Sequence, residues 1–383
     1  MKSIIMYIAL AIFLMSLSGI AMAAVFVYYP LTIKSSPVPP PLIYQSVSYP
    51  LVTDTLDSSH TSANITISLN KELHIYDYNL SAGYVAARNI NNLALSRGQS
   101  FNVSWTAYIT NYTDPNNAGV VLQEITYTCG GTYNWASFYY YGGNSVSAGG
   151  TTYNLDMSIP HLYNITIYEP SKNKITISYY VDNVLVASFP SISCSNPTIV
   201  NVEAGRWDVT NEYDLYIDNA WLFYPNGNIY NIYTDNFEDR VDDNFFVNSY
   251  SNPSGSGNVG KEVVYAFCGE VLGIQNVDSS SNYSFYLSLN SVQASNPSSI
   301  YKTWIWTGND TQKSSAISIY SSSVLQSTTS QLIVWPNEEK FIYINYTAPL
   351  SFSGNVAIYL SLIYGIPGSD AVSVYYPLKI TIG

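Results

Sequence analysis

Residues 161–189, HLYNITIYEPSKNKITISYYVDNVLVASF, contain the pattern that decides the fold. Apolar and polar residues alternate along 161–168, 174–181 and 184–189, and a period of two is typical of β-strands. The dipeptide Asp182-Asn183 separates the last two segments, and both residue types tolerate the positive φ of a two-residue hairpin turn. This stretch therefore predicts a three-stranded antiparallel meander.

The same kind of pattern extends to both sides of the meander. Strand-like segments follow one another from residue 56 to 224 without a sustained 3.6-residue apolar period, and another series runs from 261 to 383. Residues 248–260, with Pro253, Gly255 and Gly257 among serines, predict a linker between the two series. We therefore expect an all-β protein of two antiparallel β-sandwich domains, 56–247 and 261–383, the second Ig-like or a jelly roll.

Three short motifs in the first series resemble a known superfamily. FNVSW at 101–105, YYVDNVLV at 179–186 and LYIDNAW at 215–221 are similar to segments of laminin G or concanavalin A-like sandwiches. The resemblance covers about residues 56–224 and implies a jelly roll of two antiparallel sheets.

The catalytic and metal sites of that superfamily are incomplete here. Its glycosidases place two glutamates on one strand, and the nearest match, from Glu212 through Asp214 to Asp218, has Tyr216 in place of the second acid. The aspartate that legume lectins use for metal binding falls on Leu222 or Phe223. The resemblance therefore implies the fold and no activity.

Composition limits the classes of partner. Only 10% of the 383 residues are charged, 37 are tyrosine, and the net charge is -12. Such a chain has few cations with which to neutralise phosphates, so we expect no nucleic-acid partner.

The N-terminal segment predicts export. Lys2 precedes an apolar stretch over residues 4–20, and Ala21-Met22-Ala23 has the small-x-small pattern of a signal peptidase site, so residues 1–23 predict a signal peptide. The alternative is an uncleaved membrane anchor over 1–29, because the apolar run continues to Val27. Both interpretations place the rest of the chain outside the cytoplasm, secreted or at the cell surface.

Residues 24–55 combine an extended segment with a stiff proline-rich spacer, PVPPP at 37–41. The strand-like VFVYYPLTI at 25–33 recurs as VSVYYPLKI at 372–380, with seven of nine positions identical. The first copy could pair with the sheet of another copy of the chain, with its own C-terminal strand, or remain in the membrane. These three alternatives stay open at the sequence level.

Cysteines and glycosylation sequons fit an extracellular protein. Cys129 and Cys194 lie in one predicted domain and are the expected disulfide, which leaves Cys268 as a buried thiol or an intermolecular bridge. Eight Asn-x-Ser/Thr sequons become usable on export, although their number is near that expected by chance. They are Asn64, Asn79, Asn102, Asn111, Asn164, Asn282, Asn309 and Asn345.

A catalytic triad is not expected, because His60, His74 and His161 have no cysteine or acid at catalytic spacing.

An acidic cluster is a candidate site for Ca²⁺, with a solvated turn as the alternative. No other cofactor is expected. The residues of the cluster are Asp235, Glu238, Asp239, Asp242 and Asp243. A second set combines aromatic and polar types that bind glycans, with core packing as the alternative. It comprises Trp135, Tyr139, Tyr140, Asn144, Arg206, Trp207 and Asp208.

These observations predict a non-enzymatic, exported surface or filament protein with an adhesive or structural role. The Tyr-rich composition is also similar to that of surface and filament proteins of hyperthermophilic archaea and their viruses. The alternatives are a lectin-like glycan-binding protein, a virion surface protein of an archaeal virus, and a carbohydrate-active enzyme. The possible partners are glycans, or copies of the chain through the N-terminal strand.

Overall fold

The structure is a computed structural model of the chain, and it is all-β. The residues it describes are 42–48, 50–56, 62–78, 83–114, 116–157, 159–206, 212–227, 229–237, 245–246, 248–251, 259–295, 302–308, 316–320, 323–366 and 374–383. These residues include no helix that could cross a membrane. The signal or anchor segment, the first copy of the nonapeptide and the proline tract lie outside the described residues.

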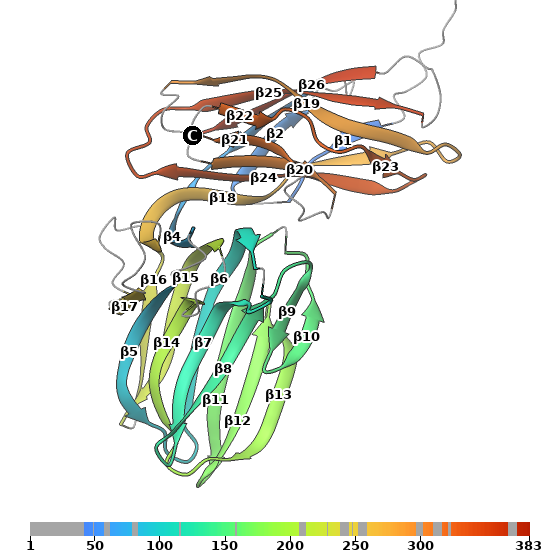
Figure 1. Cartoon of the computed structure of the whole chain (residues 1–383). Helices are drawn as coiled ribbons and strands as arrows, with labels where there is room; N and C mark the ends of the chain where they lie inside the picture. Colours follow the sequence, from blue (N-terminus) through green and yellow to red (C-terminus); the bar gives the residue numbers. More distant parts are fainter. Residues whose placement is uncertain are drawn as a thin grey trace, which may run out of the picture. The chain divides into compact units, whose positions relative to one another are not determined.

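Three sheets contain all of the assigned strands (Figure 1). The largest has thirteen strands and includes β1 (Leu42–Gln45), β4 (Asn70–Asp77), β6 (Ser100–Thr113), β11 (His161–Ser171), β12 (Lys174–Val181), β13 (Val184–Ser193), β15 (Glu212–Asn226), β16 (Ile229–Asp235), β18 (Val259–Asn276), β20 (Lys302–Thr307), β21 (Ile317–Tyr320), β22 (Ser323–Gln326) and β24 (Glu339–Pro349). The seven-stranded sheet contains β5 (Tyr84–Ala94), β7 (Val120–Cys129), β8 (Thr132–Tyr140), β9 (Ser145–Ala148), β10 (Thr151–Asn154), β14 (Thr198–Arg206) and β17 (Asn248–Ser251). The six-stranded sheet contains β2 (Val52–Leu56), β3 (Ala63–Ile67), β19 (Tyr283–Ala294), β23 (Leu332–Val334), β25 (Val356–Gly365) and β26 (Val374–Ile382).

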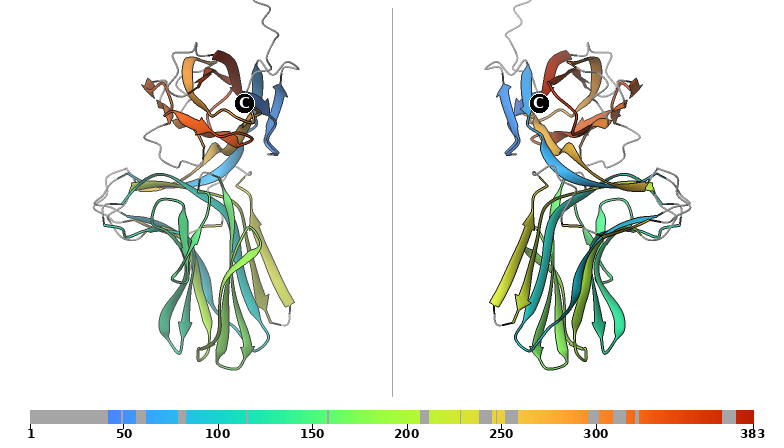
Figure 2. Two further views of the ribbon diagram at one scale, coloured as in Figure 1. Left: turned by 90° about the vertical axis from the view of Figure 1, so that its right-hand side faces the viewer. Right: turned by 90° about the vertical axis from the view of Figure 1, so that its left-hand side faces the viewer.

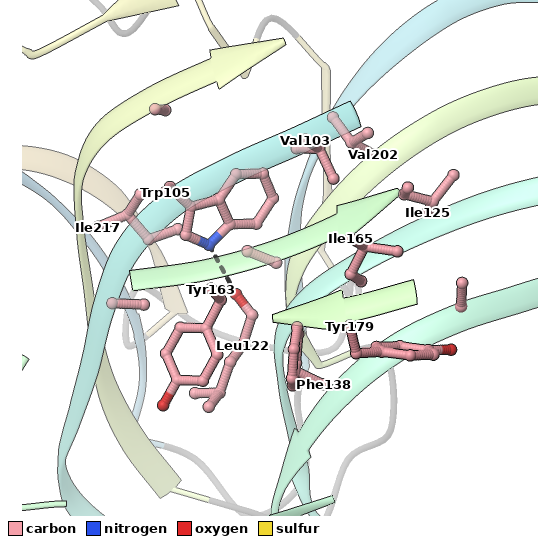
Figure 3. Packing of buried hydrophobic residues seen from close by; sticks show 14 of the residues in the cluster. Val103, Trp105, Leu122, Ile125, Phe138, Tyr163, Ile165, Tyr179, Val202 and Ile217 are labelled. Carbon is pink, nitrogen blue, oxygen red and sulfur yellow. Dashed lines mark hydrogen bonds between the residues drawn. The ribbon is translucent and has the colours of Figure 1, made fainter. Parts of the chain in front are cut away.

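The first sandwich packs the seven-stranded sheet against strands of the thirteen-stranded sheet, and Figure 2 shows these two layers from the side. Alternate residues of the facing strands fill the space between the layers, as the period-two pattern requires. Trp105 is fully buried there, and its indole N–H donates a hydrogen bond to the Leu122 carbonyl oxygen at 2.9 Å (Figure 3). This bond satisfies the polar atom of the largest side chain in the core.

The predicted meander and disulfide are confirmed. Strands β11, β12 and β13 pair in the expected order, and Asp182 and Asn183 have φ values of 50° and 65° in the turn between β12 and β13. Cys129 is bonded to Cys194. Cys268 is buried and forms no disulfide with a described residue of the chain, which favours the buried-thiol alternative.

The second sandwich packs the six-stranded sheet against the other part of the thirteen-stranded sheet. Its order is β2-β3-β26-β25-β19-β23, and β3 runs parallel to β26, unlike the antiparallel pairs around it. The C-terminal copy of the nonapeptide forms most of β26, which is hydrogen-bonded to β25 on one side and β3 on the other. The edge of β26 along residues 378–382 is therefore already paired with β3.

The expected domain limits require correction. Ala63, Ile65 and Ile67 of β3 are buried in the second core, although the sequence placed residues 56–247 in the first sandwich. The predicted linker 248–260 includes β17, which pairs with β5, and the start of β18. Both differences arise because strand partners are chosen by long-range packing, and local spacing does not encode that choice.

The long strand β18 carries the chain from one core to the other. Strand β18 pairs with β4 over its first half and with β24 over most of its length. Val263 of β18 contacts the first core, and Phe267 of the same strand is buried in the second. Because these residues are an even number of positions apart, both cores lie on the same face of this strand. The opposite face of the thirteen-stranded sheet packs against neither core.

Candidate functional site

The face of the thirteen-stranded sheet that points away from both cores is polar and aromatic, and we call it the polar face. Leu73, Leu215 and Ala107 point into the first core, so the residues next to them project from the polar face. Its members come from β4, β6, β15, β18, β20 and β24, and several are fully buried. They include Glu72, His74, Thr106, Tyr108, Asp214, Tyr216, Asp218, Cys268, Lys302, Tyr343 and Thr347.

A buried ionic network joins three strands on the polar face. Asp214 of β15 accepts a hydrogen bond from His74 Nε2 of β4 at 2.8 Å through Oδ1. Its other oxygen, Oδ2, lies 2.7 Å from Lys302 Nζ of β20, and Tyr78 donates a further hydrogen bond to the carboxylate. Asp214 is completely buried, so these partners replace the water that an ion of this kind requires.

The network shifts the pKa values of its members. Burial alone would raise the pKa of Asp214, but the hydrogen bond from His74 and the charges of His74 and Lys302 lower it below its ordinary range. Burial alone would lower the pKa of His74, but the hydrogen bonds and charges of Asp214 and Glu262 raise it. Because both side chains are fully buried, this network holds strands together and does not meet a substrate.

A cavity of about 230 Å³ opens on the same face beside this network. Glu72 of β4 and Asp218 of β15 both line it, together with Tyr108 and Cys268. The register that pairs Ile217 with Leu73 brings these two acids to neighbouring positions of adjacent strands. The pairing of β15 with β6 is irregular between Asp218 and Trp221, and such irregularities often re-aim side chains near functional sites.

The two acids of the cavity, Glu72 and Asp218, differ in burial and in hydrogen bonding. Glu72 is only 7% exposed, and its Oε2 atom has no hydrogen-bond partner within the described part of the chain. Burial, and then the charge of Asp218, raise the pKa of Glu72 to about 8, although Tyr108 acts in the opposite direction. Asp218 is partly exposed and accepts hydrogen bonds from the backbone and side-chain N–H groups of Asn219 at 2.7 Å. The raised pKa of Glu72 favours its protonated form at pH 7.

A second polar surface lies on the outer face of the seven-stranded sheet. Trp135 and Tyr133 of β8 are 62% and 56% exposed, and Tyr141 beyond the end of β8 is also exposed. The ring of Tyr139 stacks on that of Tyr141, with centroids 5.8 Å apart. We call the outer surface around these four aromatic side chains the aromatic face.

Two glutamates lie beside these rings. Ile125 and Val202 point into the core, so Glu124 of β7 and Glu203 of β14 project outward, and they stand directly opposite each other across the two strands. Ser137 donates a hydrogen bond to Glu124 at 2.6 Å, and burial raises the pKa of Glu203 despite a hydrogen bond from Asn201.

Unpaired polar atoms accompany the two acids. The buried Thr126 Oγ1 and Asn201 Oδ1 atoms have no hydrogen-bond partner among the described residues. Thr126 pairs with both Trp135 and Asn201 across the neighbouring strands, so these atoms lie in one row with the exposed indole, next to the row that contains the two acids. They are available to hydroxyl groups of a ligand.

The structure places some of the predicted glycan-binding residues on the aromatic face and one in the first core. Trp135 and Tyr139 belong to the aromatic face, and Asn144 is exposed. Tyr140 is wrong as a binding residue, because alternation along β8 turns its ring into the first core. The side chain of Arg206 and all of Trp207 and Asp208 lie outside the described residues.

The predicted calcium cluster is mostly outside the described residues. Asp235 is described and accepts a hydrogen bond from the Phe237 backbone N–H at 2.8 Å, whereas Glu238, Asp239, Asp242 and Asp243 are not described. Within the described ranges, no group of three or more His, Cys, Asp or Glu residues could hold a metal ion.

One glycosylation sequon is contradicted by the structure. Asn345 of β24 is completely buried, and its amide nitrogen is enclosed. A glycan could not leave this position in the folded protein. The side chain is buried because β24 lies between β18 and β20 in the interior of the sheet. The sequon pattern does not reveal this position.

The sequence analysis did not find the acid pairs. Along β15 the sequence shows Glu212, Asp214 and Asp218, with Tyr216 in place of the second acid. The structure supplies the partner of Asp218 from β4, and the other pair comes from β7 and β14. Only the strand order brings these acids together, so no local spacing could have indicated them.

No family model and no curated protein matches this chain. Among solved structures, it is similar to alginate lyase Aly36B in complex with an alginate trisaccharide (TM-score 0.30, 10% identity, 49% of this chain and 100% of that one). It is also similar to the endo-β-1,4-glucuronan lyase of Trichoderma reesei (0.27, 10%, 46% and 84%) and the CupB6 tip adhesin of Pseudomonas aeruginosa (0.18, 9%, 82% and 99%). At these TM-scores, the likenesses assign no activity to the chain.

The lyases nevertheless correct one prediction. Three of the similar structures are polysaccharide lyases, which contradicts the expectation that the chain is not an enzyme. That expectation depended on the lack of a catalytic pattern along single strands. The paired acids show why this reasoning was insufficient, because carboxylates can be brought together from different strands.

Proposed function

We propose that this chain is an exported surface protein that binds polysaccharide on the aromatic face of its seven-stranded sheet. The observation that carries the proposal is the exposure of Trp135 and Tyr133 on the same face as unpaired buried polar atoms. Sugar rings stack on exposed aromatic faces, while nearby oxygen and amide groups bind their hydroxyls. The signal-like N-terminus supports placement outside the cytoplasm.

The charges on this face favour a neutral polysaccharide. Glu124 and Glu203 lie beside the aromatic rings, and the chain as a whole has a net charge of -12. A polymer of uronic acids would meet repulsion from both sources. Neutral hydroxyl groups, in contrast, can donate to a carboxylate and accept from a protonated carboxyl.

The test is binding to a panel of neutral polysaccharides, with alginate as the anionic comparison, by affinity electrophoresis. We expect Trp135→Ala to weaken binding to the preferred polymer at least tenfold. Trp335→Ala is the matched control, because Trp335 is 57% exposed but lies outside the seven-stranded sheet. Equal loss in both variants, or preference for alginate over every neutral polymer, contradicts the proposal.

The acids of the same face support a second candidate, cleavage of the bound polysaccharide. Glu124 and Glu203 are opposite each other, and the raised pKa of Glu203 favours its protonated form, so the pair offers a base and an acid. Incubation with the same panel would then release reducing ends, and Glu203→Gln would abolish the release while weakening binding less than Trp135→Ala does. Release that persists in this variant contradicts the assignment.

A further inference from the structure

The cavity beside Glu72 is separate from the aromatic face and has a distinct chemical character. Among the described residues, its lining contains two carboxyl groups, of Glu72 and Asp218, and no lysine, arginine or histidine. Asn70 and Asn219 add amide groups, and Pro50, Leu51 and Pro160 add apolar surface. A site with this lining attracts positive charge.

The cavity also contains a carboxyl oxygen that needs a partner. Glu72 is more than nine-tenths buried, and its Oε2 atom has no hydrogen-bond partner among the described residues. The hydroxyl of Tyr108 also lines the cavity, beside this carboxyl group. Leaving such atoms unsatisfied is unfavourable, and a ligand that donates hydrogen bonds to them recovers that free energy.

The size and ligand set of the cavity distinguish an organic cation from a metal ion. Its volume of about 230 Å³ is far larger than a bare ion and somewhat below the roughly 300–1,000 Å³ of sites for drug-sized ligands. Within the described ranges, no three acidic, histidine or cysteine side chains converge as a metal would require. The apolar lining from Pro50, Leu51 and Pro160 suits a short hydrocarbon chain.

We propose that this cavity binds a small organic ammonium ion. Its N–H groups donate hydrogen bonds to the carboxylates of Glu72 and Asp218, and its hydrocarbon part contacts Pro50, Leu51 and Pro160. Access is from the side of Asn219, which is exposed. Binding of the cation favours the ionised form of Glu72, so a proton leaves Glu72 when the ligand enters at neutral pH.

Putrescine is the probe, and butane-1,4-diol is its uncharged counterpart of the same length. Isothermal titration of the full chain at pH 7 should show binding of putrescine and none of the diol. The measured heat should change with the ionisation enthalpy of the buffer, because a proton is released. We expect Glu72→Gln and Asp218→Asn each to weaken putrescine binding at least tenfold.

The controls make the test decisive. Glu72→Gln removes a buried acid without changing its size, so the variant should fold, and thermal unfolding checks this. Glu270→Gln is the matched control, because Glu270 is a partly buried acid of the same sheet that does not line the cavity. Equal binding of the diol, binding of Ca²⁺ in place of putrescine, undiminished binding by Glu72→Gln, or no putrescine binding overturns the proposal.

Discussion

Asp214 illustrates how single residues hold the large sheet together. Its carboxylate is fully buried and is bonded to His74 and Lys302 from two other strands. Such a pair contributes little net stability compared with an apolar substitute, but loss of one member leaves the remaining charges unpaired and buried. The consequences of substitution are therefore larger here than at a surface ion pair.

We expect Asp214→Asn to lower the free energy of unfolding by about 3–5 kcal/mol, because the buried Lys302 loses its counterion and His74 keeps only Glu262. Urea denaturation measures this change. Glu338→Gln is the control, since its ion pair with Lys340 is partly exposed and should be worth about 0–1 kcal/mol. Similar effects of the two substitutions would show that the buried network has no special role.

Glu72 predicts a dependence of stability on pH. Its pKa is about 8 when folded and near 4.5 when unfolded, so the folded state holds a proton that the unfolded state releases between these values. The contribution of Glu72 to stability therefore falls as pH rises from 4.5 to 8, by a few kcal/mol in total. Denaturation of wild type and Glu72→Gln across this range checks the sign. A variant with the same pH profile as wild type contradicts it.

At the scale of the element, the hairpin of β12 and β13 depends on its two-residue turn. Asp182 and Asn183 both have positive φ, which side chains without a local hydrogen bond adopt at a cost of about 1–2 kcal/mol. We expect Asn183→Ala to destabilise the protein by about 1 kcal/mol, whereas Asn183→Gly should cost little. Urea denaturation compares the two, and equal losses would show that the backbone conformation is not the cause.

Elements also explain why the aromatic face and the polar face were only partly predictable. The alternation along β8 placed Tyr139 and Tyr140 on opposite sides, and the sequence could have separated them by the same alternation. By contrast, nothing near Glu124 indicates that Glu203 becomes its neighbour, because β7 and β14 are separated by six strands in the sequence. Local patterns specify the face of the sheet to which a residue points. The pairing of strands specifies which residues become its neighbours on that face.

At the scale of the molecule, β18 contributes residues to both cores and pairs with β4 of the first core. Disrupting one core therefore removes packing contacts from β18, which the other core also requires. We therefore expect the full chain to unfold in one cooperative transition, with equal calorimetric and van't Hoff enthalpies. Differential scanning calorimetry makes this measurement, and two resolved transitions would show that the cores unfold independently.

The sequence by itself determined the all-β class, the meander with its turn, and the Cys129–Cys194 disulfide. These features follow from a two-residue period, from residues that tolerate positive φ, and from the few cysteines in one domain. Only the tertiary structure decided that β3 belongs to the second core and that Glu72 meets Asp218 in one cavity. Such contacts depend on which distant strands pair, and this is settled by burial of whole sheet faces, which no local stretch of sequence encodes.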